Sequence, residues 1–282
     1  MKIKSILMLA FLLPVYLMAQ PLKKQKEFDL TRDRVLYTVG YSHLDTEWRW
    51  DYTASIDEYI KNTMEENFLL FEKYPDYVFN FTGSRRYKMM KEYYPAEYRK
   101  VKEYVKQGRW HVSGSSVDEG EVNISSSESL IRQVLYGNNF FREEFGEQSF
   151  DYMLPDCFGF LANVPSVWHH CGLLGFSTQK LTWRAAVEIP FNVGVWNGPD
   201  GKGIIAALNA TRYNGEVENR LDQSDTFSER LTANFERSGF AFDYRYYGVG
   251  DKGGAPRETD VRHAVESLDN PDSKFQVVLS SS

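Results

Sequence analysis

Two hydrophobic periodicities alternate along this chain of 282 residues. Short apolar runs that are rich in β-branched and aromatic residues predict strands. Between most of these runs, apolar residues recur three and four positions apart, which predicts helices. The predicted strands span residues 35–41, 77–81, 109–112, 150–154, 176–181, 193–196, 204–208, 242–247 and 275–279.

The predicted helices follow strands in a regular rhythm. One helix through residues 56–71 ends before Pro75, and another begins at the capping pattern Ser125-x-x-Glu128 and ends at Gly146. Further helices are predicted at about 98–105, 165–171, 227–237 and 261–268. This alternation predicts an α/β fold with a mainly parallel sheet and helices on the outside. In such folds ligands bind at the carboxyl ends of the strands.

The first residues of the chain form a separate pattern. Lys2 and Lys4 precede an apolar stretch over residues 6–18, and Ala19 offers a small residue for cleavage. This pattern predicts a secretory signal peptide over residues 1–19. Pro14 and the shortness of the stretch argue against a membrane anchor, so no stable membrane span is expected after cleavage. We therefore expect an exported protein, periplasmic or extracellular.

Composition excludes some partners. The formal net charge is −6, and no block of basic residues is present, which argues against nucleic acid as the partner. Cys157 and Cys171 are the two cysteines. They could form a bridge in an oxidising compartment or remain buried thiols, but two cysteines do not make a disulfide scaffold.

Acidic and histidine side chains stand where the first and fourth predicted strands end. His43 and Asp45 follow the run 35–41 two positions apart, so their side chains project to the same side if the strand continues. Asp156 follows the run 150–154. A neutral imidazole and ionised carboxylates suit Zn²⁺, and further oxygen ligands would widen the choice to other divalent cations. The alternative for Asp156 is a turn or capping aspartate.

Other polar and aromatic positions allow two interpretations. Asp251 lies in a glycine-rich loop that is either a tight turn or a loop whose backbone approaches a ligand closely. An acidic segment after the third strand would bind hydroxyl groups or form a solvated loop; it contains Asp118, Glu119, Glu121 and Asn123. Several tryptophans near strand ends would pack in the core or stack on sugar rings, namely Trp48, Trp110, Trp183 and Trp196.

Seven segments in register resemble the α-mannosidases of glycoside hydrolase family 38. The resemblance begins with Ser42-His43-Leu44-Asp45-Thr46-Glu47-Trp48 and includes Pro155-Asp156-Cys157-Phe158-Gly159. It extends in order from about residue 35 to the end of the chain. The other five segments span residues 128–137, 140–146, 178–183, 196–201 and 248–254.

The resemblance implies an N-terminal catalytic α/β domain over residues 20–282, with a parallel-type, seven-stranded, β/α barrel-like core. It implies a zinc ion held by His43, Asp45 and Asp156, with mannose-containing oligosaccharides or glycans as substrates. It also implies a retaining reaction in which Asp156 is the nucleophile, and Asp251 is our candidate for the acid/base. Trp48, Glu121 and Trp183 are the candidate substrate-binding residues.

In the family a fourth metal ligand, a histidine, lies beyond this domain in a helical bundle, which is followed by β-rich domains. No histidine in this sequence matches its segment. We therefore expect that this chain is truncated before the helical bundle and the β domains. The truncated chain could then be inactive by itself.

Two other functions fit parts of the pattern. A metal-dependent polysaccharide deacetylase also uses aspartate and histidine ligands, but it would normally carry a His-x-x-x-His pair, and the adjacent His169 and His170 have the wrong spacing. A non-catalytic mannose-binding fragment is the second alternative. Hydrolysis of an α-mannoside, release of acetate, and binding without turnover separate the three functions.

Overall fold

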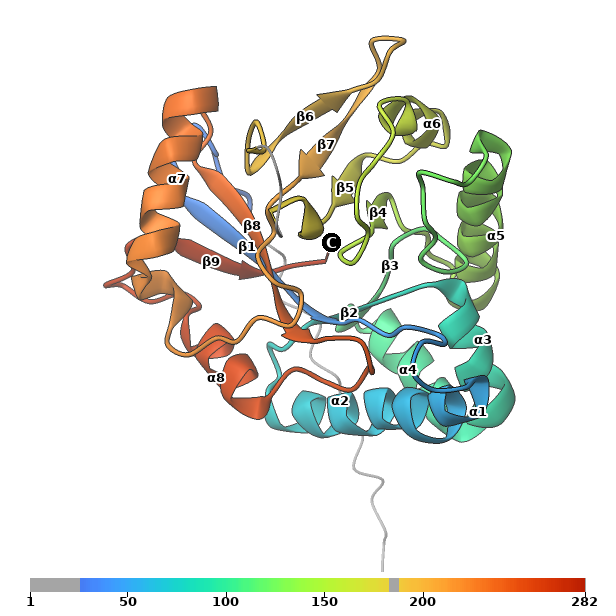
Figure 1. Ribbon diagram of the computed structural model, residues 1–282. Helices are drawn as coiled ribbons and strands as arrows, with labels where there is room; N and C mark the ends of the chain where they lie inside the picture. The colour runs from blue at the N-terminus through green and yellow to red at the C-terminus, as the bar shows by residue number, and fades with distance from the viewer. Residues whose placement is uncertain (1–25, 183–187, 282) are drawn as a thin grey trace, which may run out of the picture.

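The computed structural model describes residues 26–182 and 188–281, which form an α/β fold of two sheets surrounded by helices (Figure 1). The signal peptide predicted over residues 1–19 and the candidate sugar-binding Trp183 lie outside the described residues. None of the described helices is both long and apolar enough to cross a membrane. The strands are β1 (Val35–Ser42), β2 (Phe79–Thr82), β3 (Trp110–Ser113), β4 (Asp151–Met153), β5 (Gly175–Ser177), β6 (Val193–Asn197), β7 (Gly203–Ala207), β8 (Phe242–Val249) and β9 (Gln276–Leu279).

The helices lie between these strands in the chain. A continuous helical segment runs through α1 (Tyr52–Ala54), a π-helical stretch (Ser55–Ile60) and α2 (Lys61–Lys73). The remaining α-helices are α3 (Ser84–Tyr93), α4 (Pro95–Lys106), α5 (Ser127–Phe145), α6 (Val164–His170), α7 (Asp225–Ser238) and α8 (Glu258–Glu266). Short 3₁₀ turns occupy Lys180–Thr182 and Leu221–Gln223. Helix α3 was not predicted, because most of its residues are polar or charged.

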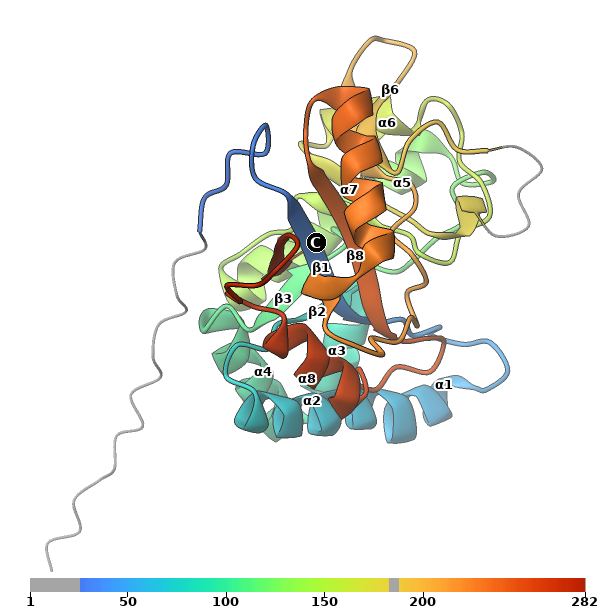
Figure 2. The ribbon, with the colours of Figure 1, turned by 90° about the vertical axis from the view of Figure 1, so that its left-hand side faces the viewer.

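The strands form one parallel sheet and one mixed sheet. In the first sheet the order is β3-β2-β1-β8, and β9 also pairs with β1; all of these pairs are parallel. In the second sheet the order is β4-β5-β7-β6, and only β6 with β7 is antiparallel. The prediction of a mainly parallel sheet with outer helices is therefore confirmed; α7, for example, lies across β8 (Figure 2).

The expected seven-stranded barrel-like core is not confirmed: the described residues contain nine strands in two sheets and no closed barrel. One reason is the segment between β6 and β7. Only residues 198–202 connect these strands, and a connection that short joins antiparallel strands, whereas parallel strands need a crossover of a dozen or more residues. The two sheets still meet through side chains. Tyr246 of β8 donates its hydroxyl to Ser177 Oγ of β5 at 2.6 Å, and Asp151 Oδ1 of β4 accepts from Gly114 N after β3 at 3.2 Å.

Close packing of helix α5 shapes the segment that leads to the acidic residues 118–121. A Cβ at Gly137 of α5 would lie 2.5 Å from the Ser116 carbonyl carbon, so only glycine allows the helix to approach this backbone. The helix begins at the cap Ser126, whose Oγ accepts from Ser129 N at 3.2 Å, one residue later than the predicted capping pattern. It ends at Gly146 in the left-handed conformation, as predicted.

Two large hydrophobic cores support the sheets, and a third, smaller cluster joins them. The larger core lies between the parallel sheet and helices α2, α4 and α8, and it includes the buried rings of Phe71, Phe79 and Trp110. The smaller core lies between the mixed sheet and α6, where the ring of Trp168 stacks on Tyr152 and Phe176 at 4.6 and 4.9 Å. The third cluster contains buried side chains of β1, β8 and β4 and therefore lies between the sheets, whereas the polar groups considered below lie at the strand ends.

Candidate metal and catalytic site

Strands β1 and β8 extend their pairing past the last strand residue. His43 N donates to Val249 O, Asp45 N donates to Asp251 O, and Gly253 N donates to His43 O, each at 2.9 Å. These backbone bonds fix the segment with His43 and Asp45 against the loop with Asp251. Asp251 itself has a φ of +69°, a conformation that costs a non-glycine residue energy and that persists mainly where the surroundings hold it.

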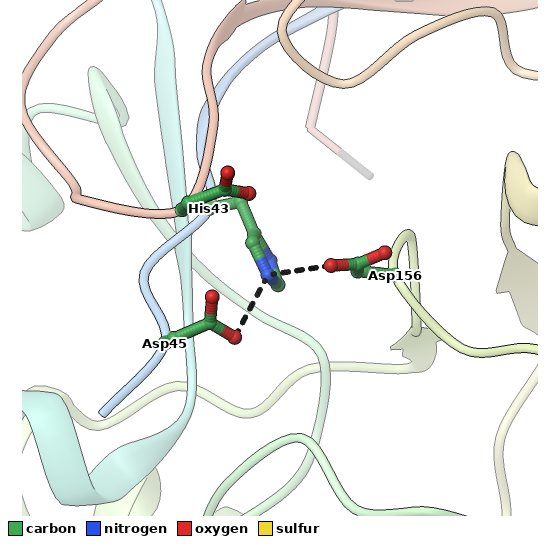
Figure 3. Close-up of side chains that lie close together, drawn as sticks. His43, Asp45 and Asp156 are labelled. Carbon is green, nitrogen blue, oxygen red and sulfur yellow. Dashed lines mark ion pairs between the residues drawn. The ribbon is translucent and has the colours of Figure 1, made fainter. Parts of the chain in front are cut away.

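Four predicted residues converge at this edge. One ligand atom each of His43, Asp45, Asp156 and Asp251 can be chosen so that all four lie within 4.8 Å of one another. The Nε2 atom of His43 lies 3.4 Å from Asp45 Oδ1 and 3.7 Å from Asp156 Oδ2 (Figure 3). His43 is buried, whereas the three aspartates are partly exposed. The arrangement therefore presents one imidazole and three carboxylates to a point that solvent can reach.

The chemistry of this group fits a divalent cation. Both ring nitrogens of His43 are buried without a hydrogen bond among the described residues, and buried polar atoms of this kind call for a partner. One imidazole nitrogen with carboxylate oxygens is a donor set that Zn²⁺ and related cations accept. The group that could hold a cation contains the predicted His43, Asp45 and Asp156 together with Asp251, and their role as ligands stays a prediction.

A second layer of charges lies behind His43. Its Nδ1 atom is 3.3 Å from Glu119 Oε2, and Glu119 is also 3.4 Å from the guanidinium of Arg86. Arg86, which is 1% exposed, lies 3.3 Å from Asp118 and donates to the backbone oxygen of Leu44, between His43 and Asp45. Burial alone would raise the pKa of Glu119, but the charges of His43 and Arg86 outweigh it and lower that pKa to about 2.

The pKa of His43 gives a testable pH dependence in the metal-free protein. Burial lowers this pKa, but the nearby Glu119 and Asp45 outweigh burial and raise it to about 10. Because the imidazole of an unfolded chain has a pKa near 6.5, the stabilisation from protonated His43 is complete below about pH 6.5 and is lost as the pH rises through about 10. We expect His43→Gln to lower the unfolding temperature in chelator more at pH 6 than at pH 10.

The matched control for this experiment is Thr178→Val, which removes a buried hydrogen bond to Leu154 O but no titratable group. Its effect on the unfolding temperature should be the same at both pH values. An equal effect of His43→Gln at pH 6 and pH 10 would contradict the prediction.

Two side chains from other elements contact the aspartates. The ammonium of Lys180 lies 2.8 Å from Asp156 Oδ1, on the oxygen that is not nearest to His43. The hydroxyl of Tyr213 donates to Asp251 Oδ1 at 2.8 Å, and its ring lies 4.8 Å from the His43 ring. Burial, followed by the negative charges of Asp156 and Asp251, raises the pKa of Tyr213, so the hydroxyl keeps its proton and remains a donor.

The candidate substrate-binding residues lie outside this group of contacts. The Trp48 side chain is 55% exposed, and the Arg49 guanidinium lies 4.2 Å from its ring centroid. At most one face of the Trp48 ring is therefore free to stack on a sugar. The Glu121 carboxylate accepts from Asn123 N at 2.9 Å and so caps a local turn. Sugar binding by Trp48 and Glu121 stays a prediction, as does the role of Trp183.

The adjacent histidines His169 and His170 lie away from this site, and the two cysteines are not among its four residues. His169 Nδ1 lies 3.1 Å from Gly203 O, and His170 Nε2 lies 2.8 Å from Asp200 Oδ2 on the outside of the mixed sheet. Cys157 and Cys171 are both free, and burial raises the pKa of each thiol.

Three contributors to the site were not predicted as site residues. Glu119 belonged to an acidic segment that could equally be solvated, and Lys180 stood unremarked within a segment of the family resemblance. Tyr213 lies in an irregular segment before α7 with no motif around it. Lys180 lies three residues after strand β5, but the strand predicted over residues 176–181 placed it inside the strand and gave no signal of its position at the site.

Comparison with known families gives a match over most of the chain. Residues 33–281 match the model described as the glycosyl hydrolases family 38 N-terminal domain. Alpha-mannosidase 2C1 of Homo sapiens is 30% identical over 249 residues, which cover 87% of this chain and 23% of that protein. Alpha-mannosidase G of Dictyostelium discoideum is 32% identical over 222 residues, which cover 78% of this chain and 20% of that protein. The chain thus spans less than a quarter of the length of these curated relatives.

Solved structures support the fold. An alpha-mannosidase from Enterococcus faecalis V583 has a TM-score of 0.64 at 19% identity, covering 88% of this chain and 28% of that chain. A Mycobacterium smegmatis protein assigned as a polysaccharide deacetylase has a TM-score of 0.52 at 11% identity, covering 93% and 91%. At these identities the likeness concerns the fold alone.

Proposed function

Because the chain belongs to glycosyl hydrolase family 38, we propose that it carries the catalytic site of a metal-dependent, retaining α-mannosidase. Its substrates are terminal α-mannosides of oligosaccharides or glycans. The single observation that carries the proposal is the convergence of His43, Asp45, Asp156 and Asp251 at the carboxyl ends of β1, β4 and β8. The names of the relatives point to the sugar, and the four side chains supply the chemistry.

His43 Nε2 and the carboxylates of Asp45 and Asp156 would hold the cation. Zn²⁺ is the proposed ion, because an imidazole and carboxylates within one cluster suit it. When bound, the cation supplies positive charge that polarises sugar hydroxyls and offsets the clustered carboxylates. The buried Nε2 atom of His43, which faces the aspartates and has no hydrogen bond in the described part of the chain, supports this assignment.

Asp156 is the proposed nucleophile. One of its oxygens forms a bond to the anomeric carbon while the bond from that carbon to the leaving oxygen breaks, and Asp251 delivers a proton to the leaving oxygen. Water then attacks the anomeric carbon, gives its proton to Asp251 and releases Asp156. Retaining enzymes place their two carboxyl groups about 5–5.5 Å apart. Asp156 and Asp251 have oxygens within 4.8 Å of each other, which supports this pairing.

Neighbouring side chains hold these two carboxyl groups in place. The ammonium of Lys180 contacts Asp156 Oδ1, and the hydroxyl of Tyr213 contacts Asp251 Oδ1, each at 2.8 Å. Each aspartate therefore has one oxygen engaged by the protein and the other directed elsewhere. Such fixed orientation is what a reaction at a single sugar carbon requires.

The test is hydrolysis of an aryl α-mannoside by the full-length protein, with the first-formed anomer identified by NMR. We expect cleavage that is lost in chelator and restored by Zn²⁺, with α-mannose as the first product. β-Mannose as the first product would exclude the retaining course. Release of acetate from an acetylated glycan without mannose release would instead indicate a deacetylase, and binding without cleavage would indicate a sugar-binding module.

A further inference from the structure

The two ring nitrogens of His43 face different surroundings. Nε2 points to the aspartates, with Asp45 at 3.4 Å and Asp156 at 3.7 Å (Figure 3). Nδ1 points to Glu119 Oε2 at 3.3 Å. A metal ligand that uses Nε2 must carry its hydrogen on Nδ1, because a neutral imidazole has one protonated nitrogen and one lone pair. The group opposite Nδ1 therefore decides whether Nε2 is available.

The Glu119 carboxylate is held so that its Oε2 atom can only accept a hydrogen bond from the direction of His43 Nδ1. Its Oε1 atom accepts from the Tyr41 hydroxyl at 2.8 Å and from the Thr82 hydroxyl at 2.9 Å, with Arg86 at 3.4 Å. These donors come from β1, β2 and α3, and the Glu119 side chain is 8% exposed. Three donors on one oxygen fix the carboxylate and leave Oε2 for His43.

Balancing the positive charge of Arg86 does not by itself explain why the Glu119 carboxylate is buried. Asp118 already lies 3.3 Å from the Arg86 guanidinium, and Arg86 also donates to Leu44 O. A second buried acid is costly to desolvate unless its interactions compensate for that cost. On its other side, Glu119 Oε2 lies 3.3 Å from Nδ1 of the buried His43 ring.

We propose that Glu119 is a positioning residue whose Oε2 accepts the hydrogen of His43 Nδ1 and thereby directs the lone pair of Nε2 toward the metal. The proposal rests on the metal site proposed above and adds a residue to it. Carboxylates that orient a ligating histidine in this way typically change metal affinity by about 10–100-fold when they are replaced.

The geometry predicts an unusual effect of Glu119→Gln. The three donors on Oε1 would select the amide oxygen, so the amide NH₂ would face His43 Nδ1. That arrangement favours a hydrogen on Nε2, the nitrogen that the metal needs. We expect the dissociation constant for Zn²⁺ to rise about 10–100-fold in Glu119→Gln. Glu119→Asp keeps an acceptor and should lose less affinity.

The experiment is competition between a chelator and the metal-free full-length protein for Zn²⁺, with Co²⁺ absorption as a second readout of the ligand geometry. The matched control is Asp243→Asn, which likewise neutralises a buried acid paired with an arginine. Asp243 lies at the start of β8, and its Oδ1 atom accepts from Arg230 Nη2 at 2.9 Å. We expect Asp243→Asn to lower the unfolding temperature and leave Zn²⁺ affinity unchanged.

The outcomes separate the two proposals. If the wild type binds Zn²⁺ and the dissociation constant of Glu119→Gln lies within twofold of the wild-type value, the role of Glu119 is overturned and the metal site stands. Absence of Zn²⁺ and Co²⁺ binding by the wild type would overturn both. Should Glu119→Gln fail to fold, Tyr41→Phe removes the shortest hydrogen bond to Oε1 and should weaken Zn²⁺ binding by a smaller factor; unchanged affinity there would count against the proposal.

Discussion

Replacing Asp156 by alanine should abolish hydrolysis of an aryl α-mannoside even when Zn²⁺ is saturating. The carboxylate is proposed both to hold the cation and to form the bond to the anomeric carbon, and added metal can restore only the first role. Loss of the covalent nucleophile lowers kcat by roughly 10⁶-fold in a well-studied serine protease. Steady-state rates of the full-length protein across a Zn²⁺ titration provide the test.

Asp45→Ala is the matched control for this experiment. Asp45 belongs to the same cluster and lies 3.4 Å from His43 Nε2, but it has no proposed bond to the sugar. Its activity should fall at low Zn²⁺ and recover substantially at high Zn²⁺. If both variants recovered to the same extent, Asp156 would be a metal ligand only and the nucleophile would have to be sought elsewhere.

A small external nucleophile gives a second readout of the same variant. Alanine at position 156 leaves space where the carboxylate stood, and azide can enter from that side of the sugar. Attack by azide on the anomeric carbon of an activated aryl α-mannoside expels the aryl alcohol and gives the β-mannosyl azide. That product identifies the side from which Asp156 acts, whereas an α-azide would place the nucleophile on the opposite side.

Much of the site could be predicted because strand ends mark it. His43 and Asp45 follow an unmistakable apolar run, and the parallel arrangement places the carboxyl ends of β1, β4 and β8 at one edge. Asp251 was ambiguous, because a glycine-rich loop alone does not show where its aspartate points. The backbone bonds from Asp45 N and Gly253 N resolve that ambiguity, and they depend on pairing between segments about 200 residues apart.

The charged layer behind His43 could not be predicted in the same way. Glu119 lies in a segment with three other polar residues, which by composition resembles a solvated loop. It is buried only because Arg86, an interior residue of the unpredicted helix α3, Tyr41 and Thr82 converge on it. A buried arginine within a polar helix leaves no periodic signal in the sequence, so neither partner identifies the other.

The fold shows a similar division. Each predicted strand has a counterpart within a few residues, although β5 ends at Ser177 and residues 180–182 form a 3₁₀ turn where a longer strand was predicted. The order of the strands within each sheet cannot be predicted from hydrophobic periodicity. For example, β9, the last strand, pairs with the first half of β1, over the register from Val35↔Gln276 to Thr38↔Leu279.

Metal should stabilise the full-length protein, and His43→Ala should remove that stabilisation. A ligand that binds only the folded state at 100 times its dissociation constant contributes about 2.7 kcal/mol. For a domain of this size, that corresponds to a rise in unfolding temperature of roughly 5–10 °C. We expect this rise when Zn²⁺ is added to the metal-free wild type. In His43→Ala, three carboxylates remain without their imidazole partner, and the rise should be absent.

His170→Ala is the matched control, because His170 also contacts an aspartate, Asp200 at 2.8 Å, but its side chain is 65% exposed on the outside of the mixed sheet. This variant should keep the full Zn²⁺-dependent rise. A rise that survived in His43→Ala but disappeared in His170→Ala would locate the cation at the α6 surface. The repulsion among the three acids at the strand ends would then be offset by Lys180 and a protonated His43 instead of a metal ion.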